Sequence, residues 1–220
     1  METLEIGNAS ISFGKNPLLH EVSFSLSKGM ILGIYGRNGC GKSTLLRLVH
    51  GSLRSGNVLR HVNGKSVTNS EVIKSKLVAI VPQHSFLPGH LKVRDLIPIY
   101  HPRAEIQDRI FYDPIIAGIS DRKIKELSHG ERKYFEVLST GLLPHPFLLL
   151  DEPFTMLEPL QIDAISRFLV QLKSTKGILL TDHYYRSVLE IADQHYVLKE
   201  GSLHAVNNEE DLRRLEYLRN

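Results

Sequence analysis

The sequence predicts an α/β fold whose core is a largely parallel β-sheet with helices packed on it. Apolar runs of strand length recur along the chain, and toward its end they alternate with amphipathic stretches of helix length. A middle stretch, at about 86–141, lacks strand-like runs altogether. Strands that alternate with helices favour parallel pairing, because each crossover between parallel strands is commonly a helix.

The first part of the chain contains most of the expected strands. Apolar and polar residues alternate in 4–13 and again in 22–26, which is typical of half-buried strands. The apolar runs 30–35 and 76–81 are expected to be buried strands, and Lys42–His50 has the spacing of a helix.

The middle stretch indicates a small helical subdomain, at about 86–141, inserted into a single domain that spans residues 1–220. Short amphipathic pieces lie there between prolines, which interrupt regular structure. The expected elements after it are strands at 147–150, 177–181 and 195–198, helices at 160–172 and 184–191, and a solvated capping helix at 209–218.

Composition and charge narrow the classes of function. The chain has 220 residues, 42% of them hydrophobic, and a net charge of only +3 with no basic tract, which argues against a nucleic-acid partner. Its one cysteine, Cys40, cannot form an internal disulfide and fits a reducing compartment. No apolar run approaches the roughly 20 residues that span a bilayer, so we expect a soluble chain.

A glycine-rich segment supplies the most specific motif. Residues 36–44 match G-x-x-x-x-G-K-[ST], the phosphate-binding loop of P-loop NTPases. Its glycines let successive N–H groups point at phosphate oxygens, and the helix that begins near Lys42 presents its positive end to the same anion. The residues expected to bind ATP here are Gly36, Asn38, Gly39, Cys40, Gly41, Lys42, Ser43 and Thr44.

Two side chains of this loop have expected roles of their own. Lys42 is expected to reach the β- and γ-phosphates, and the hydroxyl of Ser43 to bind Mg²⁺. Cys40 is either a small tolerated residue or a redox-sensitive thiol whose thiolate form the phosphate-binding environment favours.

Two acids follow the apolar strand expected at 147–150. Adjacent residues of a strand point to opposite faces, so Asp151 can face Mg²⁺ while Glu152 faces the water that attacks the γ-phosphate. Acids at strand ends also cap helices, but a phosphate loop about 110 residues upstream favours the catalytic interpretation.

With both motifs in place, the chain resembles the ABC ATPase family, and in particular the ATP-binding subunits of ABC transporters. Gln83 resembles the Q-loop glutamine, Leu127-Ser128-His129-Gly130-Glu131 the signature LSGGQ, and 155–158 the D-loop. His183 resembles the switch histidine, and Phe13 the aromatic A-loop residue. The resemblance implies an antiparallel N-terminal β-subdomain and a signature carried by the inserted helical subdomain.

The resemblance also implies roles and partners. Gln83 would contact Mg²⁺ and water, His183 the γ-phosphate and Phe13 the adenine ring, so that Glu152, His183 and Gln83 form the catalytic set. Ser128 and Gly130 would bind the ATP of an opposite subunit in a head-to-tail homodimer or heterodimer. Membrane-spanning permease subunits would hold the dimer at the cytoplasmic face of a membrane, near the stretch after Gln83 that contains Phe86.

Three residues depart from the family pattern. His129 stands where the family has glycine, Glu131 where it has glutamine, and Glu158 where it has aspartate. Since Ser128 and Gly130 are retained, we expect activity to persist. Two other classes stay open: a non-transport ABC-type ATPase of repair, translation or regulation, and a P-loop kinase, which would leave Gln83 and His183 unexplained.

Overall fold

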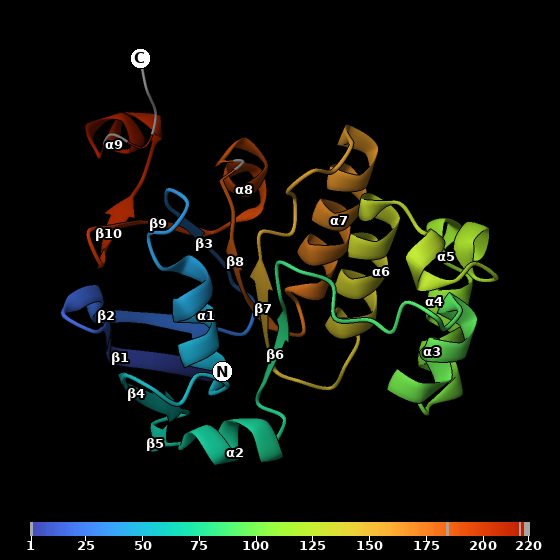
Figure 1. Ribbon diagram of the computed structural model, residues 1–220, viewed down its shortest axis with the longest axis horizontal. Helices are drawn as coiled ribbons and strands as arrows, with labels where there is room; N and C mark the ends of the chain where they lie inside the picture. The colour runs from blue at the N-terminus through green and yellow to red at the C-terminus, as the bar shows by residue number, and fades with distance from the viewer. Residues whose placement is uncertain (1, 184, 216, 218–220) are drawn as a thin grey trace.

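The computed structural model describes residues 2–183, 185–215 and 217, and arranges them as two sheets flanked by helices (Figure 1). The expected helix start at Tyr184 and the expected helix end at Leu218 lie outside these residues. Within them, no helix combines the length and the apolar content that crossing a membrane requires.

The larger sheet has the strand order β10-β9-β3-β8-β7-β6. All its pairings are parallel except that of β10 with β9, so the predicted, largely parallel core sheet is confirmed. The central strands β3, β7 and β8 are buried along their whole length, as continuous apolar runs allow. The strands are β3 Ile31–Tyr35, β6 Val78–Val81, β7 Phe147–Asp151, β8 Gly177–Thr181, β9 Gln194–Lys199 and β10 Ser202–Val206.

The smaller sheet is antiparallel and has the order β2-β1-β4-β5. Strands β1 (Thr3–Phe13) and β2 (Asn16–Ser27) form a long hairpin, which confirms the antiparallel N-terminal sheet. Sequence periodicity missed β4 (Asn57–Val62) and the two-residue β5 (Lys65–Ser66). β4 is only partly buried, with a charged residue at its buried position, β5 is exposed, and neither has a regular apolar alternation.

Helix α1 (Lys42–His50) joins the two sheets into one core. Its Leu45 and Leu46 are fully buried in a cluster that also contains Leu4 of the smaller sheet and Leu149 of the larger one. The core therefore fixes α1, and with it the loop that precedes α1, against both sheets.

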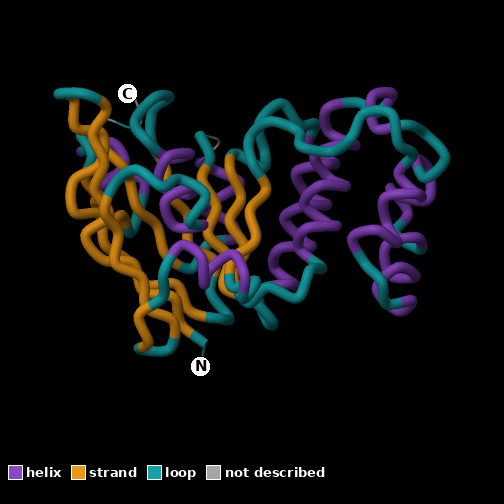
Figure 2. The backbone as a smooth tube through the Cα atoms, turned by 60° about the horizontal axis from the view of Figure 1, so that its bottom comes forward, coloured by secondary structure: helices purple, strands orange, loops and turns teal. Residues whose placement is uncertain are grey.

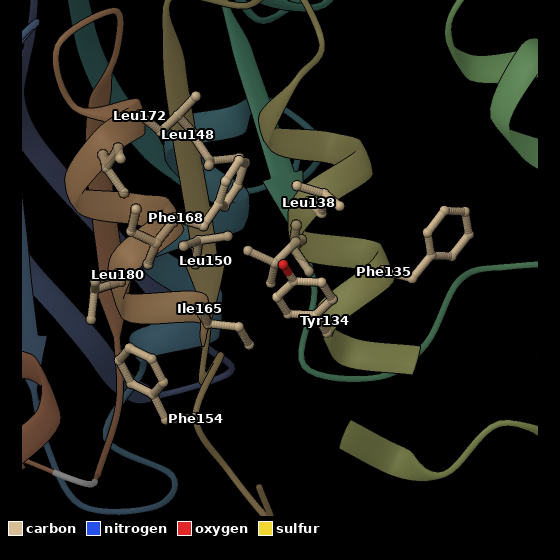
Figure 3. Packing of buried hydrophobic residues seen from close by; sticks show 14 of the residues in the cluster. Tyr134, Phe135, Leu138, Leu148, Leu150, Phe154, Ile165, Phe168, Leu172 and Leu180 are labelled. Carbon is tan, nitrogen blue, oxygen red and sulfur yellow. The ribbon is translucent and has the colours of Figure 1, made fainter. Parts of the chain in front are cut away.

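The helices between β6 and β8 form two groups, of which α6 and α7 pack on the larger sheet and α3, α4 and α5 lie farther from it. In Figures 1 and 2, α3, α4 and α5 form the far end of the molecule, and α6 lies between them and α7. Residues 133–141 of α6 are buried on every face, and Figure 3 shows Phe135 on the opposite side of α6 from Leu150 and Phe168. The helices are α2 Asn69–Lys74, α3 Val93–Tyr100, α4 Ala104–Phe111, α5 Pro114–Ile119, α6 His129–Gly141, α7 Pro159–Leu172, α8 Tyr185–Ile191 and α9 Glu209–Arg214.

Candidate functional site

The phosphate-binding loop lies between β3 and α1. Gly41 takes the N-cap position of α1 with φ 111°, and Gly39 has φ 82°, conformations in which a residue with a Cβ is strained. Gly41 has no side chain with which to cap the first turn of α1, and that turn contains no acidic residue. The first N–H groups of this helix are therefore left for an anion, as the motif predicts.

The ammonium group of Lys42 lies under this loop. The side chain is only 4% exposed, and Nζ donates a hydrogen bond to the carbonyl oxygen of Gly36 at 2.8 Å. Nζ also lies 3.3 Å from Oε1 of Glu152. The lysine of the loop and the predicted catalytic acid, far apart in the sequence, therefore form a buried ion pair.

Glu152 occupies a strained position directly after β7. Its φ of 52° is unusual for a residue with a side chain, and strain of this kind concentrates at functional sites. Its N–H group donates to the carbonyl oxygen of Thr181 at 2.9 Å, which anchors the turn to β8. Its Oε2 accepts a hydrogen bond from Nε2 of Gln83 at 2.9 Å. Three residues predicted from separate motifs thus meet at one carboxylate.

A hollow opens at this point of the surface. It contains most of the predicted phosphate loop together with Gln83 and Glu152. One member, Leu18 of β2, was missed, because an apolar residue near a strand end carries no signal of ligand binding. The lining residues are Leu18, Asn38, Gly39, Gly41, Lys42, Ser43, Thr44, Gln83 and Glu152.

Gly36 and Cys40 line a second hollow, next to Tyr217 near the end of the chain. A Cβ on Gly36 would overlap Sγ of Cys40, so the two residues are packed against each other. Burial raises the pKa of the Cys40 thiol, and the nearby charge of Lys42, which favours thiolate, does not outweigh it. Of the two alternatives for Cys40, the raised pKa favours the small, neutral residue over the redox-sensitive thiolate.

The oxygen ligands expected for Mg²⁺ come from three elements. Ser43 and Gln83 both line the first hollow, whereas Asp151 is 4% exposed and accepts a hydrogen bond from the hydroxyl of Thr181 at 3.0 Å. Hydroxyl, amide and carboxylate oxygens are the hard donors that Mg²⁺ prefers, with nucleotide phosphates completing its shell. The donor chemistry fits this ion, although among the described residues no group of three or more acids, histidines or cysteines is arranged so that it could hold a metal ion by itself.

His183 follows β8 and faces the same carboxylate. Its Nδ1 lies 3.6 Å from Oε2 of Glu152. The fully buried Asp182 accepts hydrogen bonds from the N–H groups of His183 at 2.7 Å and Phe154 at 2.9 Å, and so connects the turns after β7 and β8. Asp182 directly follows the apolar strand β8, and an acid at such a position was a sequence signal that could have identified it.

The C-terminal part of the chain also reaches His183. The hydroxyl of Tyr217 donates a hydrogen bond to the carbonyl oxygen of His183 at 3.1 Å, and the Tyr217 ring contacts that of Tyr35. Sequence reasoning missed Tyr217, because only the fold brings residue 217 to the turn after β8.

Phe13 and the signature residues lie outside the first hollow. Phe13 is 57% exposed at the end of the β1–β2 hairpin, and its stacking on adenine stays a prediction. Ser128 is the N-cap of α6, and a Cβ on Gly130 would overlap the side chain of Gln161 in α7. The hollow of a single chain is therefore built without the signature.

Known proteins are similar to this chain over most of its length. A family model described as "ABC transporter" matches residues 19–155. The lipopolysaccharide export system ATP-binding protein LptB of Haemophilus influenzae is 27% identical, over 96% of this chain and 93% of its own length. The thiamine import ATP-binding protein ThiQ of Vibrio parahaemolyticus is 28% identical, over 86% of this chain and 84% of its own.

Two solved structures have the same fold. The crystal structure of a nucleotide-free ATP-binding cassette from an ABC transporter is similar with a TM-score of 0.81 and 24% identity, covering 98% of this chain and 95% of the other. An ATP-binding cassette in its ADP conformation is similar with a TM-score of 0.79 and 25% identity, covering 97% and 94%.

Proposed function

This chain belongs to the ABC transporter family as an ATP-binding subunit, an ABC-type ATPase, and on that premise we propose that it hydrolyses Mg²⁺-bound ATP between two subunits to power a permease. The observation that carries the proposal is the convergence on Glu152: Lys42 lies 3.3 Å from one oxygen of its carboxylate, and Gln83 donates to the other at 2.9 Å. Phosphoryl transfer depends mainly on positioning and charge, and this arrangement supplies both.

In the proposed reaction each group has a distinct task. The N–H groups of the loop and Lys42 hold the phosphates, and Glu152 orients the attacking water and accepts its proton. Gln83 and His183, both beside Glu152, position that water and contact the γ-phosphate. Bound by Ser43, Gln83 and Asp151, Mg²⁺ would neutralise the charge that develops on the phosphate oxygens.

The second half of each site would come from another copy of the chain or from a related subunit. Ser128 is exposed at the start of α6, where a helix N-terminus can meet phosphate. Two large apolar side chains near the start of α7, Met156 and Leu160, are 78% and 80% exposed. Exposed apolar residues of this kind support a partner surface, and we propose that it is the head-to-tail dimer contact.

The permease would bind on another part of the surface, next to Gln83. Phe86 is 43% exposed three residues after Gln83 and lies beside Leu87 and Tyr100 of the helical region, the proposed inserted subdomain of about 86–141. A partner here would be coupled to ATP through Gln83. We propose that this contact holds the subunit at the cytoplasmic face of the membrane.

Purification from native membranes tests this proposal. Tagged wild-type chain, Glu152→Gln and Phe86→Glu would be captured from detergent-solubilised membranes, with Tyr112→Ser as a matched control at another exposed aromatic residue. We expect wild type and Glu152→Gln to capture a membrane-spanning protein, Phe86→Glu to lose it, and Tyr112→Ser to retain it.

The same preparations test the chemistry. The Glu152→Gln complex should bind ATP and dimerise with it, while hydrolysis falls by about a hundred-fold or more, because the proton acceptor is gone. Near-normal turnover of this variant would exclude Glu152 as the base. Capture of soluble proteins alone would instead favour a non-transport ABC-type ATPase.

A further inference from the structure

Lys133 of α6 is a buried cation that contacts the segment carrying Gln83. Its side chain is 3% exposed, and its Nζ donates hydrogen bonds to the carbonyl oxygens of Pro82 at 2.9 Å and Gln83 at 3.1 Å. Lysine is rarely buried unless it is paired. An ammonium group that binds two successive carbonyl oxygens fixes the orientation of both peptide units.

Glu136, three residues later on the same helix, holds Lys133 in place. It is 1% exposed, and its Oε2 lies 3.3 Å from Nζ of Lys133. Neither carboxylate oxygen accepts a hydrogen bond from the described residues. Because a buried charge is tolerated only with a counter-charge, the pair constrains both side chains.

The side chain of Gln83 connects this pair to the reaction site. Its Nε2 donates to Oε2 of Glu152 at 2.9 Å, and Oε1 of Glu152 lies 3.3 Å from Nζ of Lys42. The contacts therefore run without a gap from the interior of α6, through the main chain and side chain of Gln83, to the carboxylate of Glu152.

We propose that Lys133 is a positioning residue, which anchors the main chain at Pro82 and Gln83 so that the Gln83 amide reaches Glu152, and that Glu136 fixes Lys133. The catalytic consequence rests on the proposed function, since it needs Gln83 to act there. Because α6 begins directly after Ser128, one helix carries both the proposed partner contact and the anchor of Gln83. A small movement of α6 would be transmitted to Glu152.

NMR of the side-chain amide of Gln83 in the full chain tests the anchor directly. Its signals would be assigned by their loss in Gln83→Ala. In Lys133→Met we expect them to move to the positions of a free glutamine side chain, because the segment loses its anchor. Lys133→Arg, which keeps the charge and donors, should restore them, and Lys125→Met, an exposed lysine nearby, should leave them unchanged.

Steady-state kinetics test the catalytic consequence. We expect Lys133→Met to lower kcat on the order of ten-fold with little change in ATP affinity, since misplaced catalytic groups slow the chemical step. In a Gln83→Ala background the same change should have no further effect on kcat. Glu136→Gln keeps the shape of the side chain but removes the counter-charge, and should give a smaller shift of the amide signals.

The outcomes separate the two proposals. Unchanged Gln83 signals in Lys133→Met overturn the positioning role, whatever happens to kcat. Should Lys133→Met fail to fold, unchanged signals in Glu136→Gln overturn it instead. Shifted signals with a wild-type kcat support the anchor and contradict the catalytic role proposed for Gln83.

Discussion

Helices α1 and α6 both begin at glycine-containing segments assigned to ATP, but their first turns differ. At α1, Gly41 offers no side-chain cap and the first turn holds no acid. At α6, the Ser128 hydroxyl accepts a hydrogen bond from the N–H of Glu131 at 3.2 Å, and the Glu131 carboxylate accepts one from the N–H of Ser128 at 2.7 Å. One helix leaves its N-terminus for an anion, and the other closes it with its own side chains.

The capped N-terminus of α6 also contains a negative charge, the carboxylate of Glu131. Burial raises the pKa of Glu131, but hydrogen bonds from Ser128 and the charge of Arg122, whose Nη1 lies 2.9 Å away, outweigh burial and hold that pKa below its usual value. The Ser128 oxygen accepts one hydrogen bond and still has its proton to donate to phosphate. The difference implies that α1 offers its N-terminus to phosphate directly, whereas the phosphate contact proposed for α6 would have to compete with the carboxylate of Glu131.

The largest expected effect tests α1, whose N-terminus has no side-chain cap. Lys42→Met removes the cation beneath the loop, and we expect ATP affinity of the monomer to fall by about a hundred-fold, or roughly 3 kcal/mol, as when one partner of a buried charge pair is lost. Titration with a fluorescent ATP analogue measures it, with the exposed Lys65→Met as control. Unchanged affinity would show that the loop binds phosphate without its lysine.

The next prediction tests α6, whose N-terminus is capped by its own side chains. Ser128→Arg should reduce hydrolysis by about a hundred-fold by blocking closure over the second subunit's ATP, while monomer affinity stays at the wild-type value. Lys125→Ala, at an exposed residue outside the signature, is the control for both measurements. Loss of monomer affinity in Ser128→Arg would contradict the assignment of this surface to the opposite subunit.

The smallest expected effects concern the charge of Glu131. Glu131→Gln keeps an acceptor for the N–H of Ser128 but removes the anion, so ATP-dependent dimerisation should strengthen about three-fold, consistent with roughly 0.3–1 kcal/mol for a charge near a helix terminus. Analytical ultracentrifugation in ATP measures this change. Weaker dimerisation would mean that the carboxylate itself contacts the partner.

The same variant has a pH signature. Because the folded state lowers the pKa of Glu131 below 4.5, its stabilisation is present above pH 4.5 and is lost as the pH falls through the folded value. Guanidinium unfolding of wild type and variant should therefore differ by about 0.5 kcal/mol at pH 7, and this difference should shrink under acidic conditions.

The sequence by itself determined the parts of the protein that are local. The phosphate loop could be predicted because its chemistry needs contiguous glycines, Lys42 and a following helix, and β3, β7 and β8 because a strand buried on both faces must be apolar throughout. Asp151 and Glu152 could be predicted because two acids interrupt the apolar run at the end of β7. Edge strands such as β10 could not be predicted from the sequence, since they are partly exposed and have no regular apolar pattern.

Tertiary structure alone decided which distant residues meet. Leu18, Asp182, Tyr217 and the pair Lys133–Glu136 reach the site region through contacts that join separate elements. It also decided the state of Cys40, whose pKa depends on how the loop is buried. Spacing along a chain specifies a turn or one face of a helix, whereas burial and long-range pairing arise only when the sheets and helices pack.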